Sequence, residues 1–312
     1  MKTLRIATRG SDLALYQARH IAARIEEELQ CETELVVLRT TGDRIQDRSL
    51  AKIGGKGLFV KEIEEALLDG RADVAVHSAK DIPAKIAEGC VLAAYPERVD
   101  PRDALASRVR GTKLQDLPPG AKVGTGSTRR TALLRSIRPD LEIVPLRGNV
   151  PTRLGRLEEG ELDAVMLACA GLDRLGLGSA IDDRVSADLM LPAIGQGLLA
   201  LETRADDEWR ERIHALESFE VGLVARAERA YQRALGGDCS IPLAGFAERL
   251  PEGGVRFRGL VASLDGSTIA RAELVAADSE SELLGEHVAA AVLDAGGREI
   301  LESLAEEADA SV

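Results

Sequence analysis

Short apolar runs alternate with longer amphipathic segments in the first third of the chain. Strand-like runs lie at residues 4–7, 34–39, 73–77 and 91–95. Apolar positions at helical spacing cover residues 11–29 and 57–68. Strands that alternate with helices in this way are typical of a largely parallel sheet. The pattern therefore predicts an α/β fold.

The same order of elements recurs in the second third, which predicts a second, similar lobe. Gly10-Ser11 and Gly126-Ser127 each precede a helical segment, and residues 70–76 resemble residues 160–165. One stretch of the first lobe, from Thr40 to Gly57, has no counterpart in the second. It is polar and contains glycine, and long loops without a role are uncommon. We interpret it as a mobile lid.

A different pattern in the last third predicts a separate α+β domain. A helical run over about residues 217–235 leads into a loop with Cys239, and two further helices end the chain. Between them, short strands lie near residues 243–248, 255–262 and 269–276.

Composition limits the classes of partner. The 312 residues carry a net charge of −12, so the overall field repels nucleic acid and anionic membranes. No apolar run is long enough to span a bilayer, and the chain enters a strand pattern at once, so we expect a cytoplasmic protein. Cysteines and histidines are dispersed without metal-ligand spacing, and no metal site is predicted.

Candidate chemistry gathers where the third apolar run ends. Residues 73–76 can be buried between helices, whereas His77, Ser78, Lys80 and Asp81 follow at the carboxyl end of the run. Open α/β sheets bind their ligands at that edge. The segment offers a carboxylate beside a cation, although by itself it fits a solvated strand-to-loop junction equally well.

Cations in the second lobe indicate a ligand with several carboxylates. Ser11 and Ser127 are each predicted to cap a helix, where free backbone N–H groups accept an anion. Arginines follow the second cap, namely Arg129, Arg130, Arg147, Arg153 and Arg174. Arginine binds carboxylates through paired hydrogen bonds, and no Gly-X-X-X-X-Gly-Lys run suggests a nucleotide.

Cys239 lies in a glycine-flanked loop that can present its thiol. The commoner interpretation of an isolated cysteine is a structural one. No histidine lies nearby in sequence to act as a base, and Asp238 disfavours the thiolate. A protease-like nucleophile is therefore not indicated.

Together these segments resemble the porphobilinogen deaminase family, also called hydroxymethylbilane synthase, over essentially the whole chain. The resemblance rests on residues 5–9, 52–59, 76–83, 146–149, 191–197 and the Cys239 loop. The chain departs from the family pattern at Asp238, where a small residue is usual, and at Glu217 and Val221, where asparagine and threonine are expected. None of these three touches an expected catalytic role.

The resemblance implies two periplasmic-binding-protein-like lobes with mainly parallel sheets around a cleft, plus a small C-terminal α+β domain. The implied divisions are residues 1–96 with 197–215, residues 97–196 and residues 216–312. The implied enzyme joins four porphobilinogen molecules head to tail, with release of ammonia, into hydroxymethylbilane. A dipyrromethane cofactor, tethered to Cys239 through a thioether, would serve as primer. The enzyme would act as a monomer, without a metal, nucleic acid or a membrane.

The matched positions also imply roles for single residues, with Asp81 as the catalytic group. The implied cofactor ligands, besides Cys239, are Lys56, Ser78, Lys80, Ser127, Arg129 and Arg130. The implied substrate ligands are Arg9, Ser11, Arg147, Arg153 and Arg174. Each pyrrole carries an acetate and a propionate for such cations to neutralise. A carboxylate about 4 Å from the cation that forms when ammonia leaves gains on the order of 4 kcal/mol, which favours an ionised Asp81.

Two alternatives from other classes stay open. A two-lobed fold alone equally suits a non-catalytic binding protein for a small dianion, although a receptor needs no tethering thiol. An enzyme that forms a Schiff base through Lys80 would need that lysine desolvated, with a lowered pKa, whereas Asp81 alongside favours the charged ammonium.

Overall fold

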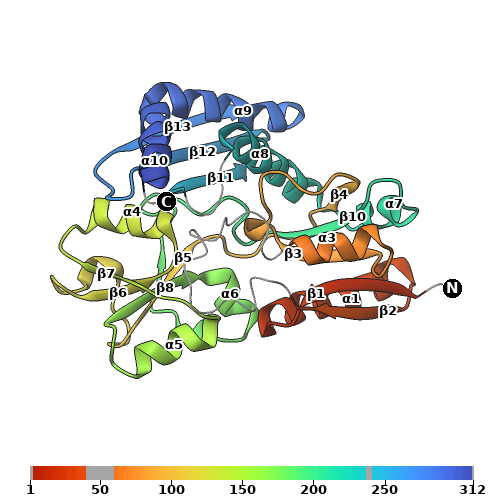
Figure 1. Ribbon diagram of the computed structural model, residues 1–312, viewed down its shortest axis with the longest axis horizontal. Coiled ribbons are helices and arrows are strands. Elements are labelled where there is room, and N and C mark those ends of the chain that lie inside the picture. The colour runs from red at the N-terminus through yellow and green to blue at the C-terminus, as the bar shows by residue number, and fades with distance from the viewer. Residues whose placement is uncertain (1–2, 40–59, 237–240, 311–312) are drawn as a thin grey trace.

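Two lobes and a smaller third domain make up the computed structural model (Figure 1). The structure describes residues 3–39, 60–236 and 241–310. The predicted lid at 40–57, Lys56 and Cys239 lie outside these ranges. Among the described helices, none is long and apolar enough to cross a membrane.

The first lobe is built on a five-stranded sheet. Its strands are β1 (Leu4–Arg9), β2 (Thr33–Leu38), β3 (Val74–Ser78), β4 (Cys90–Ala94) and β10 (Leu199–Arg204). They lie in the order β2-β1-β3-β10-β4, with β1 parallel to both of its neighbours and β10 antiparallel to both of its own. The helices of this lobe are α1 (Asp12–Leu29), α3 (Lys61–Leu68) and α7 (Trp209–His214). Ile21 and Ile25, on the buried face of α1, share one core with this sheet.

The second lobe repeats this design. Its strands are β5 (Asp103–Ser107), β6 (Lys122–Thr125), β7 (Glu142–Pro145), β8 (Ala164–Ala168) and β9 (Asp183–Val185). They lie in the order β7-β6-β8-β5-β9, again with two parallel and two antiparallel pairings. The helices are α4 (Thr128–Ile137), α5 (Val150–Glu158) and α6 (Cys169–Arg174).

The repeat extends to single hydrogen bonds. The Asp73 carboxylate accepts from the backbone N–H of Arg5 on β1 at 2.9 Å. At the corresponding place in the second lobe, the Asp163 carboxylate accepts from the N–H of Lys122 on β6 at 2.9 Å. Residues 70–76 and 160–165 are therefore similar in sequence because each forms the turn into the central strand of its own lobe, β3 in the first and β8 in the second.

The third domain combines a three-stranded antiparallel sheet with helices. Its elements are β11 (Leu243–Arg249), β12 (Val255–Ala262), β13 (Ile269–Ala276), α8 (Phe219–Leu235), α9 (Ser281–Val292) and α10 (Arg298–Ala310). Tyr231 of α8 and Phe257 of β12 are fully buried, with ring centres 5.0 Å apart. Short helical turns complete the described elements: η2 (Ala79–Asp81), η3 (Leu114–Asp116), η4 (Gly178–Ala180), η5 (Asp278–Glu280) and η6 (Leu293–Gly297). The predicted fold class is confirmed.

The chain crosses between the lobes twice, after β4 and before β10. The two crossing segments run side by side, and the Val99 N–H donates to the Gly197 carbonyl at 3.1 Å. The third domain packs on the second lobe, where Leu133 of α4 and Leu260 of β12 share one buried cluster. Just after β3, the Ala79 N–H donates to the Leu198 carbonyl of the second crossing segment at 3.0 Å, and Arg229 of α8 donates to the Ile82 carbonyl at 3.2 Å.

Candidate active site

Strand β3 ends in a single helical turn that carries the predicted catalytic residue. The turn η2 closes with a hydrogen bond from the Ile82 N–H to the Ala79 carbonyl of 3.2 Å. Ala79 and Ile82 are buried, whereas Lys80 is partly buried and Asp81 is exposed. The turn thus presents Asp81 at the carboxyl end of a buried strand, where the sequence predicts it.

A small pocket of about 50 Å³ lies beside this turn. Its polar lining comes from Arg9, Ser11, Gln17, His77, Ser78 and Asp81. The Gln17 amide donates to the Ser78 hydroxyl at 2.9 Å, and Ser11 caps α1 by accepting from the Ala14 N–H at 3.4 Å. The structure therefore brings together Arg9, Ser11, Ser78 and Asp81 of the predicted site.

Lys80 connects the two lobes electrostatically. Burial has the largest effect and lowers the pKa of Lys80, while the Asp81 carboxylate opposes it. Arg130 and Arg153 of the second lobe lower this pKa further. A lowered lysine pKa is what the Schiff-base alternative requires, so the environment of Lys80 is compatible with that alternative.

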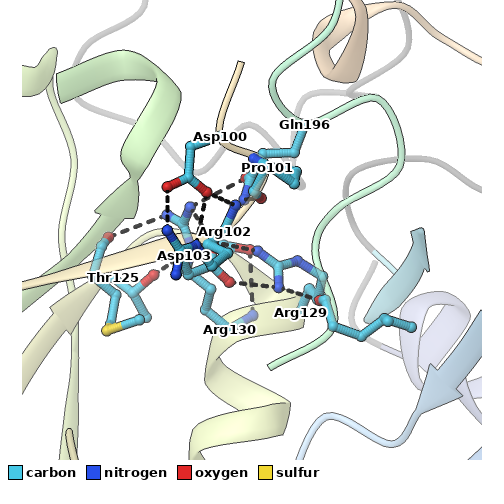
Figure 2. Close-up of polar contacts among 11 residues, drawn as sticks. Asp100, Pro101, Arg102, Asp103, Thr125, Arg129, Arg130 and Gln196 are labelled. Atoms are coloured by element: carbon cyan, nitrogen blue, oxygen red, sulfur yellow. Dashed lines mark hydrogen bonds and ion pairs between the residues drawn. The ribbon is translucent and has the colours of Figure 1, made fainter. Parts of the chain in front are cut away.

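Asp103, at the start of β5, binds two arginines in the interior of the second lobe (Figure 2). Its carboxylate accepts from Arg129 at 2.8 and 2.9 Å and from Arg130 at 2.9 and 2.8 Å. The Gln196 amide adds a bond of 3.0 Å. Burial alone would raise the pKa of Asp103, but the two guanidinium groups hold it well below its usual range. Two cations against one carboxylate leave this cluster positively charged.

Arg129 and Arg130 follow the Ser127 cap, as the sequence predicts, but they are less accessible than a ligand-binding role suggests. They lie in the first turn of α4 and are 4% and 5% exposed. Arg129 also donates to the Leu191 carbonyl at 2.7 Å, and Arg130 to the Met166 carbonyl at 3.1 Å. Ser127 caps the helix by accepting from the Arg130 N–H at 3.3 Å. Protein groups therefore take up most of the donors of both side chains.

Arg147 and Arg153, at the start of α5, are more open to a ligand. Arg153 donates through Nε to the Gly148 carbonyl at 2.7 Å. Burial lowers the pKa of Arg153 to about 10, with Arg130 and Arg147 adding to the effect and Asp81 opposing it. Arg147 is exposed and has no hydrogen bond or ion pair within the described part of the chain. These two side chains can offer donors to an anion beside Asp81.

Arg174, unlike the other predicted substrate ligands, is bound to the segments that cross between the lobes. It ends α6 and is 7% exposed, and its Nη2 donates to Glu97 at 3.0 Å and to the Gly197 carbonyl at 3.1 Å. Glu97 also contacts Nε2 of His20 on α1 at 2.8 Å. Arg174 thus joins the second lobe to the crossing segments and to the first lobe, and its role as a substrate ligand stays a prediction.

Gln17, Gln196 and Glu202 had no predicted role, and His77, one of the candidate polar residues, is buried. Gln17 gave no signal beyond its place in an amphipathic helix. Gln196 lies in a motif that carries the family resemblance, yet only the structure shows it bound to Asp103. The buried pair of His77 and Glu202, 2.9 Å apart, joins β3 to β10 and depends on strand pairing that spacing cannot reveal.

The arrangement is suited to a ligand with several carboxylates that develops positive charge at one point. Lys80 and Arg153 lie close enough to interact with the exposed carboxylate of Asp81, and Arg130 and Arg147 add positive charge beside Arg153. Cations bind the carboxylates of such a ligand, and a fixed carboxylate stabilises a cation formed during reaction. No described group of histidine, cysteine and acidic residues has the arrangement of a metal site.

Two family models match the chain. One is described as porphobilinogen deaminase, dipyromethane cofactor binding domain, and matches residues 4–212. The other is described as porphobilinogen deaminase, C-terminal domain, and matches residues 223–294.

Similar proteins bear the same name. A porphobilinogen deaminase from Syntrophomonas wolfei is 46% identical over 96% of this chain and 98% of the relative. Another, from Syntrophus aciditrophicus, is 48% identical over 96% of this chain and 98% of the relative. Among solved structures, a periplasmic substrate-binding protein of an ABC transporter from Coxiella burnetii is 14% identical, with a TM-score of 0.43 over 69% of this chain and 91% of that one.

Proposed function

This chain belongs to the porphobilinogen deaminase family, and from that premise we propose how its residues carry the reaction. It is a hydroxymethylbilane synthase, a transferase that joins four porphobilinogen molecules head to tail with release of ammonia. The linear tetrapyrrole belongs to porphyrin and haem biosynthesis, and its synthesis is primed by a covalently bound dipyrromethane. The relatives support this function and not the non-catalytic dianion receptor.

The cofactor carboxylates are held by cations around Asp81. The donor set fits such a group. The charges of Lys80, Arg130 and Arg153 lie close enough to interact with one another, and Arg147 has no hydrogen bond or ion pair in the described part of the chain. When bound, the dipyrromethane supplies the pyrrole ring to which the first substrate is joined. The proposed cofactor ligands are Lys56, Ser78, Lys80, Ser127, Arg129 and Arg130, with Cys239 as the thioether anchor.

Asp81 is the catalytic group in this proposal. The observation that carries the assignment is its position, because an exposed carboxylate lines the pocket at the end of β3 while cations of both lobes lie around it. Its charge stabilises the positive charge that develops on the substrate as ammonia leaves. It can also accept the proton that is lost from the pyrrole ring to which the substrate is joined.

Substrate carboxylates bind at both sides of Asp81. Arg9 and Ser11 line the same pocket, and the N–H groups at the start of α1 favour an anion there. Arg153 contributes from the second lobe, where its charge interacts with that of Asp81, and Arg147 lies close enough to Arg153 to bind the same ligand. Arg174, which lies by the crossing segments, completes the proposed set.

The wider assignments are part of the same proposal. The first lobe comprises residues 1–96 and 197–215, the second 97–196, and the C-terminal domain that carries the cofactor cysteine 216–312. Strand β10 supports the discontinuous first lobe because it pairs with β3 and β4. The enzyme acts in the cytoplasm as a monomer, and its net charge of −12 disfavours nucleic acid as a partner.

Replacing Asp81 tests the proposal. In Asp81→Asn the shape is kept and the charge is lost, so we expect kcat to fall by roughly a hundredfold or more. Asp81→Glu misplaces the carboxylate by about 1 Å and should retain more activity than Asn, since such a shift costs up to about a hundredfold. Ammonia release and tetrapyrrole formation are followed with enzyme that carries its cofactor.

The matched control is Asp116→Asn, an exposed aspartate in the helical turn η3 of the second lobe. It should leave kcat unchanged. A near wild-type rate in Asp81→Asn would show that the carboxylate is not catalytic and would remove the proposed mechanism.

A further inference from the structure

Arg229 of helix α8 holds the chain directly after the catalytic turn. Its side chain crosses from the third domain to the first lobe and is almost wholly buried, with Arg229 only 5% exposed. Nη1 donates to the Ile82 carbonyl at 3.2 Å, and Nη2 donates to the carbonyls of Pro83 and Ala84 at 2.8 and 3.1 Å. One guanidinium group thus binds three successive carbonyls that begin one residue after Asp81.

In the described part of the chain, Arg229 is held by hydrogen bonds to neutral acceptors and not by an ion pair. Within the described residues, no carboxylate lies within hydrogen-bonding distance of Arg229, and its Nε is buried without a partner. Its remaining bond joins Nη1 to the Gln232 amide oxygen at 2.7 Å. A buried charge without an ion pair is costly, and here hydrogen bonds to carbonyl groups offset that cost. The three carbonyl bonds are what an apolar residue could not supply.

The preceding residue of α8 holds the other side of the catalytic turn. The Glu228 carboxylate accepts from the Gly195 N–H at 2.6 Å. Gly195 packs directly against the turn, because a Cβ at this position would lie 2.7 Å from the Lys80 nitrogen and 2.8 Å from the Ala79 carbonyl carbon. Glu228 and Arg229 therefore fix the segment that carries Asp81 between them.

The same helix leads to the cofactor anchor. Helix α8 ends at Leu235, and Cys239 follows four residues later in the sequence. We propose that Arg229 is a positioning residue that fixes the Asp81 turn to the helix leading to Cys239, so that the catalytic carboxylate keeps a constant position relative to the C-terminal domain. This inference rests on the catalytic role proposed for Asp81.

Arg229→Lys keeps the charge but loses the planar fork that reaches several carbonyls. We expect kcat to fall by about tenfold, within the range that a carboxylate displaced by less than 1 Å would give. KM should change by less than about twofold, because the proposed substrate ligands are untouched. Intact mass should show the cofactor still attached, and amide hydrogen exchange in residues 79–90 should be faster than in the wild type.

Arg233→Lys is the matched control. Arg233 lies one turn further along α8, is partly exposed, and pairs with Glu282 at 2.5 Å. It should leave kcat and the exchange of residues 79–90 at wild-type values. If Arg229→Lys lowers only the melting temperature, with kcat and exchange as in the control, Arg229 is merely structural and the inference is wrong.

A double-mutant cycle with Asp81→Glu shows whether Arg229 acts through Asp81. Since both substitutions misplace the same carboxylate, Arg229→Lys should lower kcat much less in the Asp81→Glu background than in the wild type. Independent, multiplicative effects would overturn the positioning role while leaving the catalytic role of Asp81 intact. A near wild-type rate in Asp81→Asn would instead overturn the proposed function, and this inference with it.

Discussion

At the scale of single residues, the interior of the second lobe holds an unusual concentration of charge. Arg129 and Arg130 converge on Asp103, and each of the three is at most 5% exposed. Removing one partner from a buried ion pair costs about 3–5 kcal/mol, because a charge is left without compensation. The field of Arg130 also reaches Lys80 and Arg153, whose pKa values it lowers. The cluster thus stabilises the interior of the lobe and adds positive charge to the proposed anion site.

Arg130 and Arg147 should respond differently to the same substitution. Arg147→Leu removes an exposed donor, so we expect KM to rise by about tenfold to a hundredfold, while stability changes by less than about 0.5 kcal/mol. Arg130→Leu disrupts the Asp103 cluster and should lower the free energy of unfolding by about 3–5 kcal/mol. Urea unfolding and steady-state kinetics measure the two effects. Equal stability of both variants would contradict the structural role given to Arg130.

The sequence predicts where the residues of this site lie along the strands and helices better than it predicts their hydrogen-bond and ion-pair partners. Ser78 ends a buried strand, Asp81 lies in the turn directly after it, and Ser127 precedes a helix, as local pattern predicts for all three positions. Asp103 comes from a strand that pairs with β8 and β9, and only the folded sheet brings it to Arg129 and Arg130. Local pattern identifies donors, whereas long-range pairing decides which of them remain open to a ligand.

At the scale of elements, the catalytic turn depends on a close approach between two segments. Gly195 has a φ of 74° and lies against the backbone of Ala79 and Lys80. Backbone with positive φ favours glycine, and here a side chain would also meet main-chain atoms, which cannot swing aside. Packing therefore explains why glycine stands at position 195 of the motif at residues 191–197, which also carries the family resemblance.

Gly195→Ala should be costly in both stability and rate. We expect the left-handed backbone and the contact with Lys80 to cost together more than about 2 kcal/mol, and kcat to fall as η2 is displaced. Gly111→Ala is the control, since Gly111 has a φ of 79° with nothing within 4 Å of an added Cβ. It should cost only about 1–2 kcal/mol. If the two variants are alike in stability and kcat, Gly195 does not support the turn.

Most elements are predictable because burial imposes a regular pattern on them. The strands of the third domain agree closely with the runs near residues 243–248, 255–262 and 269–276. By contrast, β10 returns to the first lobe after the whole second lobe, and its place between β3 and β4 is set by tertiary pairing. Arg129 and Arg130 belong to the first turn of α4, since the Ser127 cap begins that helix immediately after it.

At the scale of the whole molecule, the proposed mechanism draws on all three parts. The first lobe supplies Asp81, the second supplies most of the cations, and the third supplies Arg229 and the helix leading to Cys239. The other cysteines are poorly suited to hold a cofactor. Burial has the largest effect on both Cys90 and Cys169 and raises their pKa values to about 12, and Cys31 is 3% exposed. A thiolate is the reactive form, so these sites are disfavoured.

The mass of the purified protein tests the central claim, that the chain builds its product on a primer held at Cys239. We expect an intact mass above that of the 33.3 kDa chain by two linked pyrrole units, with peptide mapping that places them on Cys239. Cys239→Ser should lack this addition, because a hydroxyl is the poorer nucleophile. An unmodified wild-type chain from cells that supply porphobilinogen, or pyrroles mapped to Cys31, Cys90 or Cys169, would contradict the account.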